Sequence, residues 1–351
     1  SDGGEGYSKP MISTGYTKDL NADKLAAQSA EELAEQLNVT VRTRTQVASI
    51  DTQAQVVHLE GGEALPFSEL VLALGAELIR PPIGGDAAED VLGVNDLDDY
   101  RRFQDLLAAK GAKKVAIIGA GLIGCEFTND LLNGGFTVEA VDPMGWCLPT
   151  LLPEQSGRAV QAALEEKGAR FHFGPLATEV NRVGEGYAVT LNNGDSIEAD
   201  AVLCAVGVRP RTGLASDAGI EVNRGIVTDR QLRTNACNVY AMGDCAEVAG
   251  HVLVYVAPLM AAARALAATL AGEATEVSYP AMPVAIKTPA CPVVVSPPAK
   301  DAEGDWHFEG EAPDIKALFR SGEGELLGFA LTGQAAKERM ALTKELPAIL
   351  G

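Results

Sequence analysis

The sequence predicts an α/β fold with a smaller α+β unit at its C-terminal end. Strand-like and helix-like segments alternate along most of the chain, a glycine-rich turn joins a strand to a helix at 119–124, and residues 281–351 are rich in short strands. Alternation of this kind is typical of helices that pack on a mostly parallel sheet. A chain of 351 residues suits two or three domains.

Before the glycine-rich turn, the apolar patterns predict a helix, three strands and a second helix. In the first two strands apolar and polar residues alternate, which is typical of half-buried antiparallel strands, whereas the third is apolar throughout. Prolines and glycines at 80–85 interrupt the pattern, as a crossing between domains would. In chain order, the expected elements are a helix over 23–38, strands over 39–51, 54–60 and 69–75, and a helix over 96–111.

After the turn, helices and strands continue to alternate. The Asn193-Gly194 pair between two apolar runs predicts a hairpin over 187–200. The other elements expected in this part are helices over 155–168, 258–272 and 335–350 and strands over 171–174 and 201–207.

The glycine-rich turn carries the most specific motif. Residues 114–127 read KVAIIGAGLIGCEF, and the strand that follows ends in Asp142. Gly119 would make the tight turn, Gly121 would admit a pyrophosphate, and Gly124 would let the helix pack on the strand. Asp142 would bind the ribose hydroxyls, and the lack of a neighbouring Arg favours NADH over NADPH. The alternative is that the glycines only tighten a turn.

Composition excludes several classes of function. A net charge of −20 argues against nucleic acid and anionic membrane surfaces as partners. The longest apolar stretch contains Arg264, so we expect no membrane helix. The six cysteines form no close pair, which suits a reducing cytoplasm, and the four histidines are scattered. We therefore expect a cytoplasmic protein without a metal site.

A second motif lies at 234–244, where TNACNVYAMGD contains a short apolar strand that ends in Gly243 and Asp244. An Asp in this place can accept hydrogen bonds from sugar-like hydroxyl groups, and the glycine allows close approach of the backbone. The alternative is an Asp that only caps a turn.

Together these motifs resemble the FAD-dependent pyridine nucleotide oxidoreductases of the glutathione-reductase fold. The resemblance implies two Rossmann-like nucleotide-binding domains, for FAD and NAD, plus a small α+β domain. Gly75 and Gly207 would end the strands at the crossings, and Asp244 would bind the FAD ribitol. The FAD domain would comprise 1–79 and 207–280, the NAD(H) domain 80–206 and the C-terminal domain 281–351.

The family's first FAD-binding strand and glycine turn are not found in this sequence. We therefore expect about thirty further residues before Ser1, and weak FAD binding by the chain as given.

A narrower resemblance is to the rubredoxin–NAD reductase branch, carried by YSKPMISTG at 7–15 and VAIKTPACPVVVSPP at 284–298. Disulfide reductases of the family carry cysteines where 7–15 has none. The resemblance implies hydride transfer from NADH to FAD and single-electron transfer to rubredoxin. The alternatives are a reductase of flavorubredoxin or a [2Fe–2S] ferredoxin, or a non-catalytic nucleotide-binding redox sensor or interaction protein.

The resemblance also implies roles for three charged residues. Lys9 matches a basic residue near the flavin N5 edge and could pair with Glu126, which we place in the first turn of the cofactor-binding helix. Lys287 is a second cation near the flavin. The alternative for Glu126 is an acid that is favoured only by the helix dipole, and the alternative for Lys287 is a solvated residue on a strand.

Docking of an acidic carrier on an acidic chain requires a local basic patch. The expected candidates lie in the C-terminal unit and are Lys316, Arg320, Lys337, Arg339 and Lys344.

Overall fold

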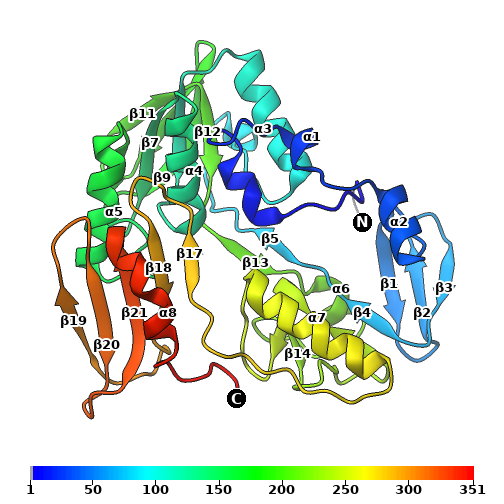
Figure 1. The fold of residues 1–351 in the computed structure, drawn as a ribbon. Coiled ribbons are helices and arrows are strands. Elements are labelled where there is room, and N and C mark those ends of the chain that lie inside the picture. The colour runs from blue at the N-terminus through cyan, green and yellow to red at the C-terminus, as the bar shows by residue number, and fades with distance from the viewer. Residues whose placement is uncertain (1–2) are drawn as a thin grey trace.

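The computed structural model describes residues 3–351 (Figure 1). Its centre is a four-stranded parallel sheet in which the strand after the glycine-rich turn lies next to the strand before it. The strand order is β12 (Ala201–Cys204), β6 (Lys114–Ile118), β7 (Thr137–Asp142) and β8 (Arg170–Phe173). β6 and β12 are almost continuously apolar because both faces of the sheet are covered, whereas β7 and β8 also contain Glu139 and His172.

One face of this sheet packs against helices α3 (Leu97–Ala109) and α4 (Leu122–Asn133). The other face packs against the antiparallel sheet of β9 (Ala177–Val183), β10 (Gly186–Leu191) and β11 (Ser196–Ala199). A charged cluster lies on the central sheet, where Glu139 contacts Lys114 at 2.6 Å and His172 at 2.7 Å. The predicted hairpin over 187–200 is formed by β10 and β11.

A second core forms from segments on either side of this unit in the sequence. The parallel pair β4 (Leu70–Leu72) and β15 (Val239–Ala241), the pair β14 (Ile226–Thr228) and β16 (Ala246–Val248), and helices α6 (Gly213–Asp217) and α7 (Val256–Leu270) share one apolar cluster. The antiparallel strands β1 (Val47–Asp51), β2 (Val56–Leu59) and β3 (Ala64–Pro66) pack against it. Two antiparallel strands, β5 (Ala76–Leu78) and β13 (Val208–Pro210), carry the chain into and out of the central unit.

The C-terminal unit is a five-stranded antiparallel sheet in the order β17 (Val284–Ile286), β18 (Val293–Ser296), β21 (Leu326–Thr332), β20 (Lys316–Arg320) and β19 (Asp305–Glu309). One face packs on α5 (Glu154–Glu166) and the loop before it. The other is covered by the 3₁₀ helix η4 (Gly333–Glu338) and the short helix α8 (Arg339–Thr343).

Three predicted elements differ from the structure. The helix predicted over 23–38 is two helices, α1 (Ala22–Leu25) and α2 (Ala30–Leu37), because Ser29 and Glu32 form a capping box that starts a new helix. The first strand begins at Val47 rather than at 39. Asn38 and Arg44 have φ values of 53° and 49°, which a strand does not accommodate.

The final helix predicted over 335–350 is also wrong. Only residues 339–343 are α-helical, and the chain beyond Lys344 extends so that Leu350 pairs with Tyr279. Within residues 3–351 no helix is long and apolar enough to cross a membrane.

Candidate functional site

The glycine-rich turn lies between β6 and the N-terminus of α4. Gly119 has φ +110°, and a Cβ there would lie 2.6 Å from the carbonyl oxygen of Ala205. A Cβ on Gly124 would overlap the carbonyl group of Gly119, so the helix packs on the turn without room for a side chain. Gly121, the N-cap of α4, faces open space. An open backbone at a helix N-terminus fits a pyrophosphate group.

Asp142 lies at the C-terminal end of β7, next to this turn, and is 8% exposed. Its Oδ2 accepts a hydrogen bond from the Ala120 N–H at 2.7 Å, and its Oδ1 accepts one from the Met144 N–H at 2.8 Å. Each oxygen keeps a lone pair for a ribose hydroxyl. Within residues 3–351 no basic side chain forms an ion pair with Asp142.

A buried ion pair lies further along α4. Glu126 is 3% exposed, and its carboxylate contacts Lys287 Nζ at 2.5 and 2.6 Å. The Lys287 backbone N–H donates to the same carboxylate at 2.9 Å, and Ser13 Oγ donates at 2.5 Å. Because these donors occupy both oxygens, the predicted pairing of Glu126 with Lys9 is wrong. Glu126 is also in the second turn of α4 rather than the first, since the helix begins at Leu122.

Two further polar residues on α4 fix the neighbouring segments. Asn129 Oδ1 accepts a hydrogen bond from the Ala290 N–H at 3.0 Å. Asp130 accepts hydrogen bonds from the Tyr16 and Thr17 N–H groups at 3.0 and 2.7 Å. Burial raises the pKa of Asp130, while the bonds from Thr17 and Tyr16 oppose the shift. One helix therefore holds segments that are more than 250 residues apart in the sequence.

Lys9 begins the 3₁₀ helix η1 (Lys9–Thr14), and its Nζ donates to Asn95 Oδ1 at 2.8 Å. The Lys9 side chain is partly exposed. Burial of its ammonium group by the surrounding protein lowers the pKa of Lys9, and attraction to Asp244 opposes this shift. Burial raises the pKa of Asp244, and Lys9 opposes that shift. Lys9 is therefore hydrogen-bonded to Asn95, and its charge acts on Asp244 without a direct ion pair.

The Asp244 carboxylate accepts no hydrogen bond from any residue within 3–351. A half-buried carboxylate with free lone pairs can accept hydrogen bonds from the hydroxyl groups of a polyol. Gly243, directly before it, has φ +75°. These observations fit the ribitol chain of FAD.

A glycine directly precedes each of the two crossing strands, and its carbonyl oxygen accepts a hydrogen bond from the other crossing segment. Gly75 accepts a hydrogen bond from the Arg211 N–H at 3.0 Å, and Gly207 accepts one from the Ile79 N–H at 3.0 Å. Both glycines have positive φ values, 68° and 115°. The predicted glycines thus lie where β5 and β13 meet the rest of the chain.

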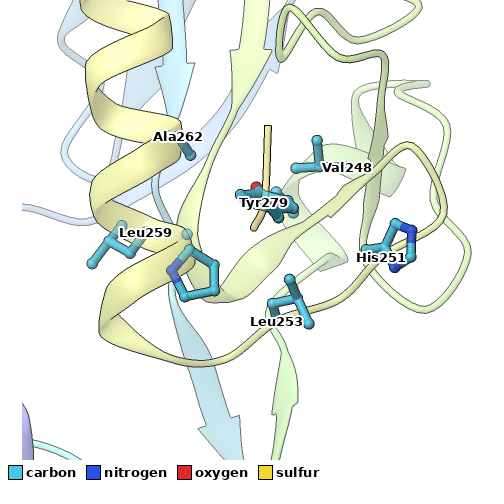
Figure 2. Close-up of a pocket in the computed structure, with 9 residues that line it drawn as sticks. Val248, His251, Leu253, Leu259, Ala262 and Tyr279 are labelled. Carbon is cyan, nitrogen blue, oxygen red and sulfur yellow. The ribbon is translucent and has the colours of Figure 1, made fainter. Parts of the chain in front are cut away.

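A small cavity of about 10 Å³ lies behind Gly243, between α7 and the loop that contains His251 (Figure 2). It has room for about one water molecule and is too small for a nucleotide. Gly121, Asp142 and Asp244 do not line this cavity. Within residues 3–351 no group of three or more His, Cys, Asp or Glu side chains could hold a metal ion.

Comparison with known proteins agrees with this geometry. Residues 3–268 match the model of the pyridine nucleotide-disulphide oxidoreductase family, and residues 276–346 match a model described as a rubredoxin binding C-terminal domain. The chain belongs to the pyridine nucleotide-disulphide oxidoreductase family. The family resemblance drawn from the motifs and the predicted α/β fold class are confirmed.

Individual relatives are similar over the whole chain. The chain is 57% identical to the rubredoxin-NAD(+) reductase of Alcanivorax borkumensis, covering 100% of this chain and 91% of the relative. It is 36% identical to the nitric oxide reductase FlRd-NAD(+) reductase of Aliivibrio fischeri, covering 99% and 90%. Among solved structures, a ferredoxin reductase from Rhodopseudomonas palustris has a TM-score of 0.85 at 25% identity, covering 97% of this chain and 86% of that chain.

Proposed function

We propose that the protein is an FAD-dependent reductase that takes hydride from NADH and passes single electrons to rubredoxin. One geometric observation supports this assignment most directly. The helix η1 carries Lys9, which bonds to Asn95 and whose charge acts on Asp244, while Ser13, four residues on, bonds to Glu126 on the helix that follows the glycine-rich turn. A single short segment therefore connects the two sites that we assign to FAD and NADH.

Each residue has a defined task in this proposal. Gly119, Gly121 and Gly124 shape the backbone that binds the NADH pyrophosphate, and Asp142 orients the adenosine ribose. Asp244 accepts hydrogen bonds from the ribitol of FAD. When bound, FAD accepts hydride and releases electrons one at a time, which is chemistry that the protein itself does not supply.

The cationic residues divide their tasks. Lys9 presents its charge where negative charge arrives with hydride, whereas Lys287 compensates the charge of buried Glu126 and is a second, weaker contributor. The segment 7–15 contains no cysteine, so no thiolate is available there for disulfide exchange.

We further propose that the FAD domain comprises 1–79 and 207–280, the NAD(H) domain 80–206, and the C-terminal domain 281–351. Three apolar clusters whose buried members each fall within one of these units support this division. Two further clusters join the units, since Ile12, Ala22 and Leu25 pack with the NAD(H) unit and α5 packs on the C-terminal sheet. The six cysteines are free, which supports a cytoplasmic location.

The C-terminal unit supports rubredoxin as the acceptor. Residues 276–346 match the rubredoxin binding model, and the relative with 57% identity is named a rubredoxin-NAD(+) reductase. Three basic residues on η4 and α8 and just beyond them are exposed: Lys337, Arg339 and Lys344. Lys316 is less available than the sequence suggested, because it contacts Glu309 at 3.2 Å and Glu338 at 3.1 Å.

A flavorubredoxin is the second candidate acceptor, because several relatives of 34–36% identity are named FlRd-NAD(+) reductases. An anaerobic rate comparison with rubredoxin, the rubredoxin domain of a flavorubredoxin and a [2Fe–2S] ferredoxin would rank the acceptors. The proposal expects rubredoxin to be reduced fastest at equal concentration. Failure of NADH to reduce bound flavin would instead favour a binding protein or redox sensor.

A further inference from the structure

Asn95 is a buried side chain that joins three segments of the site. It lies directly before the N-cap of α3 and is 8% exposed. Its Oδ1 accepts the hydrogen bond from Lys9 Nζ at 2.8 Å, and its Nδ2 donates to the Ala76 carbonyl oxygen at 2.9 Å. Its backbone N–H donates to Asp99 Oδ2 at 3.1 Å. η1, β5 and α3 therefore meet at this one residue.

The two hydrogen bonds of the Asn95 side chain, to Lys9 and to Ala76, form a bridge that requires an amide group. An ammonium group only donates hydrogen bonds, and a backbone carbonyl only accepts them. The Asn95 side chain does both from two different atoms, and these two partners also fix which way the amide points. Because Ala76 is the first residue of β5, directly after Gly75, the bridge anchors Lys9 to the crossing strand.

The bridge also leaves the charge of Lys9 without a direct counter-ion. Within residues 3–351 Lys9 forms no ion pair, and its hydrogen-bond partner is neutral. Lys287, in contrast, contacts the carboxylate of Glu126 at 2.5 Å. The charged groups that act on Lys9 from a greater distance are Asp244, Asp96 and Asp99, which attract it, and Arg211, which repels it.

We propose that Asn95 is a positioning residue that holds the Lys9 ammonium as a cation without a counter-ion, so that its full charge faces the flavin. The inference rests on the proposed function, because this task exists only where a flavin lies next to Lys9. A fixed and uncompensated cation stabilises developing negative charge without reorganisation. A carboxylate at position 95 would hold Lys9 as firmly but would cancel its charge.

The test compares Asn95→Asp with Asn95→Leu, each alone and combined with Lys9→Met. Two properties are measured: the midpoint potential of the bound flavin and the rate of its reduction by NADH under anaerobic conditions. We expect both single variants to make the potential more negative and to slow reduction about tenfold. Asn95→Leu, which adds no charge, should have no further effect in the Lys9→Met background, because Asn95 would act through Lys9.

The matched control is Asn181→Leu on β9, which removes the acceptor of the Asp86 N–H bond at 3.0 Å and should leave both properties unchanged. The pH dependence of the flavin potential distinguishes a loss of the position of Lys9 from a cancellation of its charge. As pH falls, the introduced carboxyl of Asn95→Asp gains a proton and becomes neutral, so its difference in potential from wild type should narrow. The difference for Asn95→Leu should stay constant.

Two outcomes would overturn the inference while the proposed function stands. In the first, Asn95→Asp keeps the wild-type potential and rate across the pH range. In the second, Asn95→Leu lowers the rate equally in the Lys9→Met background, which would indicate a general effect on folding. A wild-type chain whose bound flavin NADH does not reduce would contradict the proposed function itself.

Discussion

Removing the Lys287 side chain tests whether the buried carboxylate of Glu126 depends on its cation. Glu126 is 3% exposed, and its side chain would keep the bonds from Ser13 and from the Lys287 N–H but lose the ammonium group. Breaking a buried ion pair by removing one partner costs about 3–5 kcal/mol. Because the Lys287 side chain is 29% exposed, we expect Lys287→Met to lower the free energy of unfolding by about 2–3 kcal/mol, below the fully buried range.

The assay is unfolding in urea, monitored by tryptophan fluorescence. Each transition is fitted separately because several units unfold. Lys316→Met is the matched control: Lys316 is also paired with acids, but the side chains of Glu309 and Glu338 are 63% and 52% exposed. Pairs of this kind are worth about 0–1 kcal/mol. The double variant Glu126→Gln with Lys287→Met should recover part of the loss, because no buried charge is then left unpaired.

The reasoning would be refuted by a Lys287→Met variant that is no less stable than Lys316→Met. The same conclusion would follow if the double variant were less stable than Lys287→Met alone. Either result would mean that Ser13 and the backbone suffice to hold the Glu126 carboxylate.

Three further predictions concern the nucleotide, the partner and pH. Asp142→Ala should raise the KM for NADH at least tenfold with a smaller change for NADPH; wild-type use of NADPH equal to that of NADH would contradict the ribose assignment. Rubredoxin reduction should slow as salt rises, and Arg339→Glu with Lys344→Glu should slow it further while leaving NADH-to-flavin transfer intact, whereas salt-independent rates and a silent double variant would remove this patch from the docking surface. Burial opposes ionisation of Glu139, but its bonds from Lys114 and His172 outweigh that effect and hold its pKa below the usual 4.5. Its stabilising contribution is therefore complete above pH 4.5 and is lost as pH falls through the lowered pKa. The difference in unfolding free energy between wild type and Glu139→Gln, measured in urea, should shrink in that pH range. A difference that grew as pH fell would refute the assignment.

The sequence was sufficient for features that depend on local spacing. The glycine-rich turn, the acid at the end of β7 and the Asn-Gly hairpin are each set by residues within one or two elements. The same holds for Gly243 and Asp244 at the end of β15. In these cases the backbone geometry demands particular residue types at fixed positions.

The sequence could not show which side chains that lie far apart along the chain form hydrogen bonds with each other. The sequence suggested Glu126 as a partner of Lys9, but in the structure Lys9 donates to Asn95, directly before α3, while Glu126 bonds to Ser13 and Lys287. Asn129 and Asp130 were missed as site residues. The available signal was four polar residues within the five positions 126–130 of a helix that is otherwise apolar except for Asn133, which indicates polar groups that must find partners inside the protein.

The network on α4 has a consequence for where acceptor specificity lies. Moving η1 away from α4 would break the bonds of Ser13 to Glu126 and of Tyr16 and Thr17 to Asp130 at once, and several of these groups are buried. The cation at Lys9 should therefore keep its place relative to the glycine-rich turn whatever protein docks. Relatives named for rubredoxin and for flavorubredoxin both align over 99–100% of this chain, so they share the segments that build this part of the site. Differences in acceptor should then depend on the surface of the C-terminal unit, and exchanging 276–346 between two such relatives should exchange acceptor preference while leaving the rate of NADH-to-flavin transfer unchanged.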